Sequence, residues 1–301
     1  MQILTFDTSA LNALSNDTES AALVAGINAA YRVRLCGSSV DEILATQNEQ
    51  TRNRLLSICP QLLAVGDCTW PFNWIVEKLI AGFERAPGFD WKALNVRSIE
   101  YEDEISRRET MTQEFVRQQH AELSAAKRRL AGILDSARPT VEASFAAGAP
   151  RPQSFREFLQ MAQGTFWYYA GRLYKRGGGA QTGDQRLQEF VKTCPPFQAM
   201  VLAAAMFVYG RCVRGAQLPE SRRADRLDIL MAIYLPYCDL FVTNDRKQEA
   251  CLRDIASEAD IDSVVVPYNR LRDSLASIGT AFRAKCGTLM TQWRHETNLH
   301  G

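Results

Sequence analysis

The sequence predicts an α/β protein with a three-layer α/β/α arrangement and a mostly parallel central sheet, joined to an all-helical region. Near both ends of the chain, short apolar runs alternate with amphipathic stretches of helical period. This alternation is typical of a parallel sheet that is covered by helices on both faces. Between these parts, residues 98–213 keep a helical period without strand signals. A length of 301 residues is enough to bury a sizeable core.

The first strand is expected at residues 3–6, an apolar run that ends abruptly at Asp7. Thr8 or Ser9 follows at once, and hydroxyl side chains in this position commonly cap a helix. The periodicity then predicts a helix over residues 20–30, followed by a strand over 31–36. The chain therefore opens with strands and helices in alternation.

Ser39 and Glu42 have the spacing of a capping box, in which each side chain bonds a free amide at a helix start. We therefore expect a helix from this point that Pro60 ends. The apolar run at residues 62–65 is the predicted third strand, and residues 69–83 form another amphipathic helix.

The remaining segments complete the expected domain organisation. A helical insertion occupies about residues 98–213, after which strands are predicted at 239–243 and 263–267. The sheet-containing domain thus covers residues 1–275, interrupted by the insertion, and 276–301 form a polar tail.

Composition excludes several classes of protein. With 46% hydrophobic and 23% charged residues, the chain has the composition of an ordinary globular protein. A net charge of +1 provides no general attraction for nucleic acid, so any such binding depends on local patches. The 8 cysteines lack CxxC pairs and are expected to be reduced and mostly buried. No stretch has the form of a signal peptide or a membrane span, so we expect a cytoplasmic protein without a membrane partner.

Four acidic residues are positioned to converge. Asp7 and Asp245 follow the strands predicted at 3–6 and 239–243, while Glu42 and Asp228 lie near the starts of helices. In a parallel sheet, ligands gather beyond the carboxyl ends of the strands. If the two strands are neighbours, these carboxylates meet and repel one another unless a cation neutralises them. Oxygen ligands of this kind suit Mg²⁺ or Mn²⁺, which can activate water for attack on a phosphodiester.

Two segments resemble the nuclease family known as PIN domains. ILTFDTSALNAL, around Asp7, resembles the family's opening, in which a short strand ends in Asp followed by Thr or Ser. DILMAIYLPYCDLFVTNDRKQ resembles its closing segment, in which an acid at a helix start precedes the acid of a V-T-x-D turn. Asp228 and Asp245 have this spacing. The insertion is much longer than the linker of compact toxin members of the family.

The resemblance implies a Mg²⁺- or Mn²⁺-dependent endoribonuclease. It places Asp7, Glu42, Asp228 and Asp245 in the catalytic positions, with Asp7, Asp228 and Asp245 as metal ligands and Thr8, Thr243 and Asn244 in support. Asp41 competes with Glu42, and Asp225 with Asp228. RNA, an inhibitor protein and a second copy of the chain are the partners that the resemblance suggests.

Basic residues flank the acids of the closing segment, namely Arg222, Arg223, Arg226, Arg246 and Lys247, and are expected to attract a nucleic acid to the rim of the cleft.

Other interpretations remain open. Asp7 and Asp245 can serve simply as helix caps. A haloacid-dehalogenase-like phosphohydrolase also begins with a strand ending in Asp, but Ser9 stands where that family needs a second Asp. A non-catalytic protein of the same fold, with a helical region that binds a protein or nucleic-acid partner, is the second hypothesis.

Overall fold

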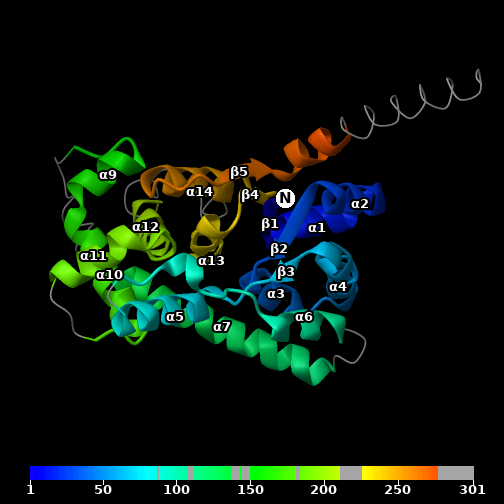
Figure 1. The fold of residues 1–301 in the computed structure, drawn as a ribbon, viewed down its shortest axis with the longest axis horizontal. Coiled ribbons are helices and arrows are strands. Elements are labelled where there is room, and N and C mark those ends of the chain that lie inside the picture. The colour runs from blue at the N-terminus through cyan, green and yellow to red at the C-terminus, as the bar shows by residue number, and fades with distance from the viewer. Residues whose placement is uncertain are drawn as a thin grey trace, which may run out of the picture.

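The computed structural model describes residues 1–86, 88–107, 112–136, 143, 150–180, 184–210 and 226–276. Within them, a central sheet carries helices on both faces, and a group of helices extends to one side of it (Figure 1). The predicted tail at 276–301 lies outside the described residues apart from Ala276.

The sheet has five parallel strands in the order β3-β2-β1-β4-β5. These are β1 (Gln2–Phe6), β2 (Tyr31–Leu35), β3 (Asp67–Cys68), β4 (Leu240–Thr243) and β5 (Val264–Pro267). The predicted α/β class is confirmed, and β1 and β4 are indeed neighbours. After β1, the chain adds β2 and β3 on one side of it and then β4 and β5 on the other. The strand order therefore reverses between β1 and β4, where open α/β sheets commonly bind ligands.

Side chains along the strands alternate between two cores, as the pleat of a strand requires. Phe6, Leu35 and Val242 enter one core, which is covered by α1 (Thr8–Asn16), α2 (Ser20–Ala30) and α4 (Glu49–Leu62). Phe241 and Val265 enter the other. The sheet is thus buried on both faces.

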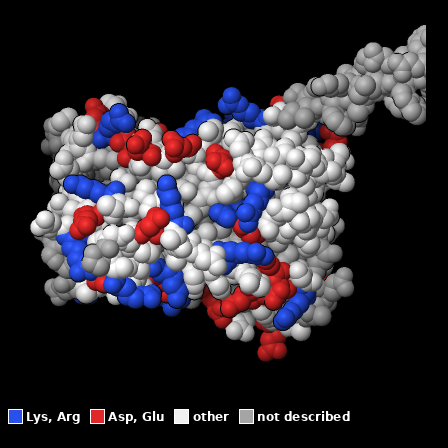
Figure 2. Space-filling view, in the orientation of Figure 1, with Lys and Arg blue, Asp and Glu red and all other residues white. Residues whose placement is uncertain are grey.

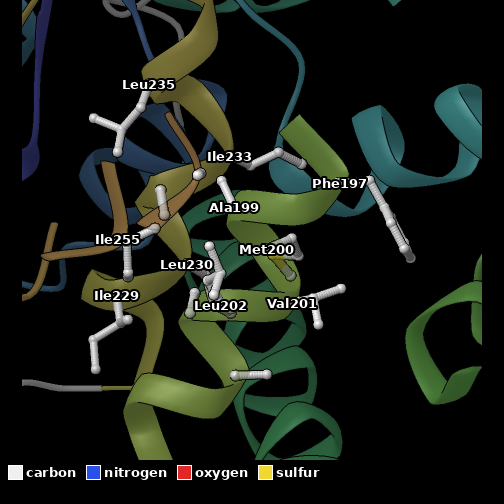
Figure 3. Packing of buried hydrophobic residues seen from close by; sticks show 14 of the residues in the cluster. Phe197, Ala199, Met200, Val201, Leu202, Ile229, Leu230, Ile233, Leu235 and Ile255 are labelled. Atoms are coloured by element: carbon white, nitrogen blue, oxygen red, sulfur yellow. The ribbon is translucent and has the colours of Figure 1, made fainter. Parts of the chain in front are cut away.

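The second core is shared between the sheet and the helical region. Its helices are α5 (Phe72–Arg85), α9 (Phe155–Met161), α10 (Gln163–Arg176), α11 (Asp184–Thr193), α12 (Pro195–Val208), α13 (Arg226–Leu230), the 3-10 helix η6 (Met231–Tyr237) and α14 (Arg246–Glu258). α12 is apolar on every side and lies against α13, η6 and α14 (Figure 3). A helix that is apolar all round needs burial on all sides. The helical region therefore packs into the same core as the sheet.

The prediction of helices without strands in the middle of the chain is confirmed for its described residues. α6 (Ile99–Ser106) and α7 (Gln113–Ser136) precede the helices named above, with the 3-10 helix η2 (Trp91–Ala93) before them. Two pairs of these helices are separated by a single residue. One break falls at Ala162, between α9 and α10, and another at Cys194, where Pro195 begins α12.

The prediction of a capping box formed by Ser39 and Glu42 is wrong. α3 (Gly37–Leu44) begins before Ser39, because distant residues bind its first amides. Gly37 N donates to Thr69 Oγ1 at 3.1 Å, and Ser38 N donates to the hydroxyl of Tyr234 at 3.2 Å. α4 is a separate helix capped by Asn48, and it contains Pro60 instead of ending there.

The third strand also differs from the prediction. Residues 62–65 end α4 and form the 3-10 helix η1 (Leu63–Val65), while β3 is the two-residue strand that follows. β3 carries the buried carboxylate of Asp67, which Arg32 and Arg34 of β2 each approach at 2.7 Å. Charge pairing between neighbouring strands therefore fixes this edge of the sheet, where the sequence suggested an apolar run.

The described cysteines are free, and Cys251 is the one among them that is not buried. No single helix of the described chain is long and apolar enough to cross a membrane, although the bent pair of α11 and α12 together meets the same test of length and composition.

Candidate functional site

Asp7 lies at the carboxyl end of β1, with 5% of its surface exposed. Its backbone is extended, and its Oδ1 accepts a hydrogen bond from Ala10 N at 2.7 Å. Asp7 is therefore the N-cap of α1, and the prediction of Thr8 or Ser9 as the cap is wrong because both residues are already inside the helix.

Two hydroxyl groups hold the Asp7 carboxylate in place. Ser9 Oγ lies 2.9 Å from Oδ1 and 2.8 Å from Oδ2, and Thr243 Oγ1 donates to Oδ2 at 2.8 Å. Thr243 comes from the end of β4, so this contact ties the two central strands together beyond their carboxyl ends.

Thr243 has a second acceptor within reach. Its Oγ1 lies 2.6 Å from Gln248 Oε1, and Gln248 Nε2 is committed to the carbonyl of Asp228 at 2.9 Å. One hydroxyl proton cannot serve both Asp7 and Gln248. When Thr243 turns to Gln248, Ser9 is the hydroxyl that still donates to the Asp7 carboxylate.

The pKa of Asp7 is raised to about 6. Burial is the main cause, and it outweighs the hydrogen bonds from Ala10, Ser9 and Thr243, which favour the ionised form. The negative charge of Glu42 raises the pKa further. A bound cation would reverse this shift, since it favours the carboxylate.

Asp245 caps α14 in the same way that Asp7 caps α1. Its Oδ1 accepts from Lys247 N at 2.7 Å and from Gln248 N at 3.2 Å. The two caps are linked, because Asp245 N donates to Thr243 Oγ1 at 3.0 Å and Asn244 N donates to Ser9 Oγ at 2.9 Å. Both acids are thus helix caps.

Glu42 approaches from α3, on the other side of β1. Its Oε2 accepts from Thr8 Oγ1 at 2.7 Å, and Lys127 Nζ of α7 lies 3.3 Å from its Oε1. Thr8 therefore supports Glu42, whereas Thr243 supports Asp7. The neighbouring Asp41 accepts from the hydroxyl of Tyr101, and burial raises the pKa of Asp41 to about 6.

These acids line one cavity of about 360 Å³ beyond the carboxyl ends of β1, β2 and β4. Its walls include the four predicted acids, Asp7, Glu42, Asp228 and Asp245, and also Asp41, the alternative to Glu42. Ser9 and Gln248 line it as well. The convergence that the strand ends suggested is therefore present. Asp7 and Glu42 share this cavity with Asp228 and Asp245 because β1 is paired with β4.

Of the basic residues predicted at the rim of the cleft, the structure describes the side chains of Arg246 and Lys247. Arg246 is exposed and Lys247 half-buried in the first turn of α14, outside the cavity wall. Arg222, Arg223 and Asp225 lie outside the described residues, as does the side chain of Arg226.

The carboxylates and hydroxyls of the site offer oxygen ligands, the type that Mg²⁺ and Mn²⁺ prefer. No group of three His, Cys, Asp or Glu side chains in the described chain is arranged to hold a metal ion. Asp7 and Asp245 are occupied as caps, and Glu42 pairs with Lys127. The residues fit such ions in chemical type, and binding requires the carboxylates to turn from their present partners.

Sequence reasoning missed three residues of this site. Ser9 and Gln248 stand two and three places after an acid at the start of a helix, a position from which a side chain can reach back to the cap. Lys127 gives no such signal, because its contact with Glu42 depends on how α7 packs against α3.

No protein-family model, curated protein or solved structure matches this chain.

Proposed function

We propose that this chain is a metal-dependent nuclease of the PIN type, with RNA as the expected polymer. The observation that carries the proposal is that Asp7, Glu42, Asp228 and Asp245 line a single cavity at the point where the strand order reverses. The choice of RNA comes from the sequence resemblance to PIN domains.

Asp7, Asp228 and Asp245 are the proposed ligands of Mg²⁺ or Mn²⁺, with Glu42 completing the acidic set. A divalent cation bound there lowers the pKa of the attacking water and stabilises the leaving oxygen. Ser9 and Thr243 hold the Asp7 carboxylate at a fixed orientation.

The N-terminus of α14 offers a place for the phosphates of the polymer. Arg246 is exposed there, and Lys247 lies beside it. Basic side chains and the positive end of a helix both attract anions. We expect these two residues to hold the backbone next to the acidic cavity without contacting the bases.

Cleavage of labelled single-stranded RNA and DNA in Mn²⁺, in Mg²⁺ and in chelator tests the proposal. We expect cutting that requires metal and that Asp7→Asn reduces by at least about 100-fold, as loss of a positioned catalytic charge commonly does. Glu189→Gln, on the exposed face of α11, is the matched control and should cut at the wild-type rate. Metal-dependent cutting that survives in Asp7→Asn would exclude this site.

One observation favours the second hypothesis, a non-catalytic protein of the same fold. Lys127 already neutralises Glu42 from within the chain, which leaves one acid fewer for a metal. If neither polymer is cut in any metal, the partner-binding hypothesis replaces the nuclease.

A further inference from the structure

A second cavity, of about 470 Å³, opens between α5, α6 and α7 and extends to α10 and α12. It adjoins the acidic cavity, because Asp41, Phe72 and Leu123 line both. Cavities of this size commonly hold small molecules or single side chains of a partner. Nothing in the proposed nuclease chemistry uses it.

One wall of this cavity is aromatic. Trp70 and Trp74 stack with their ring centroids 4.4 Å apart, and Tyr101 meets Trp70 edge-on at 6.4 Å. The three rings are half-buried. The ammonium group of Lys78 lies 4.9 Å from the centroid of Trp74, so a cation of the chain itself already lies against the outer ring of this group.

The charged side chains in the rest of the lining are predominantly acidic. Figure 2 shows acidic side chains gathered over α6, at the lower centre of the molecule. Five carboxylates belong to the lining: Asp41, Glu77, Glu100, Glu104 and Glu122. None of them forms an ion pair with a residue that the structure describes. The basic side chains in the lining are those of Arg129 and Arg176, and both are exposed.

Two of these five carboxylates are more shielded from solvent than the others. Asp41 and Glu104 are half-buried, whereas the other three acids are exposed. The pKa of Glu104 is raised, first by burial and then by the charge of Glu100. A positive ligand between Asp41 and Glu104 would relieve both effects.

We propose that this cavity binds an organic cation, an alkylammonium or guanidinium group, that lies against Trp70 and Tyr101 and is neutralised by Asp41 and Glu104. Aromatic rings and carboxylates both attract such groups, and rings favour them over strongly hydrated metal ions because the rings replace little of an ion's water. A nucleotide would also stack on the rings, but its phosphate would face five carboxylates and two guanidinium groups. The excess of negative charge therefore favours the cation.

The cation can be a free polyamine or a basic side chain of another protein. Titration of the full chain with spermidine and with a capped Gly-Arg-Gly peptide, followed by tryptophan fluorescence and calorimetry, tests both sources. Saturable binding of either probe that weakens with salt is the expected result. Tighter binding of the peptide assigns the site to a partner protein, and tighter binding of spermidine assigns it to a free polyamine.

Two variants locate the binding. Glu104→Gln should weaken it roughly 10- to 100-fold, since it removes a charged partner, and Trp70→Leu roughly 2- to 30-fold, since it removes a ring. Glu189→Gln is the control and should bind as the wild type does.

Should Trp70→Leu fail to fold, Glu104→Gln decides alone, because it keeps the shape of the side chain. Unchanged affinity in Glu104→Gln, the absence of saturable binding, or tighter binding of GMP than of both cations would overturn the proposal. None of these readouts depends on cleavage.

Discussion

Lys127 of α7 places its ammonium group 3.3 Å from Oε1 of Glu42, on the wall of the acidic cavity. α7 belongs to the helical region and Glu42 to the sheet-containing part of the chain. The helical region therefore supplies a cation to a site whose acids come from the sheet-containing part of the chain.

Replacement of Lys127 by Met should free Glu42 to bind metal. If the ammonium group competes with a divalent ion for this carboxylate, Lys127→Met binds Mn²⁺ roughly 3- to 10-fold more tightly, equivalent to about 1 kcal/mol. Calorimetric titration with Mn²⁺ measures this. Stability should change little, because the Lys127 side chain is 38% exposed.

Lys192→Met is the matched control for that measurement, since Lys192 is exposed on α11 and away from the cavity. Equal or weaker Mn²⁺ binding in Lys127→Met would show that Lys127 and the metal do not compete for Glu42.

Asp7→Asn should stabilise the metal-free protein at neutral pH. The pKa of Asp7 is about 6 in the folded chain, above the ordinary value of 3.8. Below pH 3.8 the carboxyl is protonated in both states. As the pH rises from 3.8 to 6, the unfolded chain releases this proton while the folded chain keeps it, so the free energy of unfolding falls.

Asn carries no such charge, and its amide can donate to Thr243 while its carbonyl still caps α1. We therefore expect Asp7→Asn to be more stable than wild type by about 1–3 kcal/mol at pH 7.5 in chelator, with the difference gone near pH 3.5. Urea unfolding at both pH values measures it. A variant that is less stable at pH 7.5 would mean that the hydrogen bonds of the carboxylate outweigh its burial.

Added metal should reverse this order of stability. A ligand that binds only the folded state raises its stability, by about 2.7 kcal/mol at a concentration 100 times its dissociation constant. Wild type should therefore melt at a higher temperature in Mn²⁺ than in chelator, while Asp7→Asn should not respond. An equal rise in both proteins would place the metal elsewhere.

Asp245 allows the two roles of an acid at a helix start to be separated. Asp245→Ala removes the cap of α14 and should cost about 0.5–2 kcal/mol, whereas Asp245→Asn keeps the cap and should cost little. If Asp245 also binds metal, both variants lose metal-dependent cleavage. Thermal unfolding and the RNA assay together distinguish the cases, and full activity in Asp245→Asn would leave the residue as a cap alone.

The strands β1 and β4 were accessible from the sequence, and the start of α3 was not. The runs before Asp7 and Asp245 are local and apolar, so periodicity found both strands. The start of α3 depends on Thr69 and Tyr234, which bind the amides of Gly37 and Ser38 from far along the chain. No local pattern reports such partners.

The same difference explains the third strand. Residues 62–65 are the more apolar run, yet the strand is Asp67–Cys68, because Arg32 and Arg34 neutralise Asp67 across the strand boundary. In the site itself, the four acids followed from strand ends and spacing. Lys127 did not, since its position depends on the packing of α7 against α3.

Gly37 is the position where the close contact between α3 and the segment after β3 is most sensitive. A Cβ atom at Gly37 would lie 2.5 Å from Thr69 O and from Pro71 N, and backbone atoms cannot move aside as a flexible side chain can. Gly37→Ala should therefore lower the free energy of unfolding by at least about 1–3 kcal/mol, the usual penalty of overpacking.

Gly164→Ala is the control, because Gly164 lies in α10 with nothing within 4 Å of its Cβ position. There the added methyl group should stabilise the helix by about 0.5–1 kcal/mol. Chemical unfolding of the two variants in parallel measures both effects, and a Gly37→Ala protein as stable as wild type would show that α3 does not begin against residues 69–71.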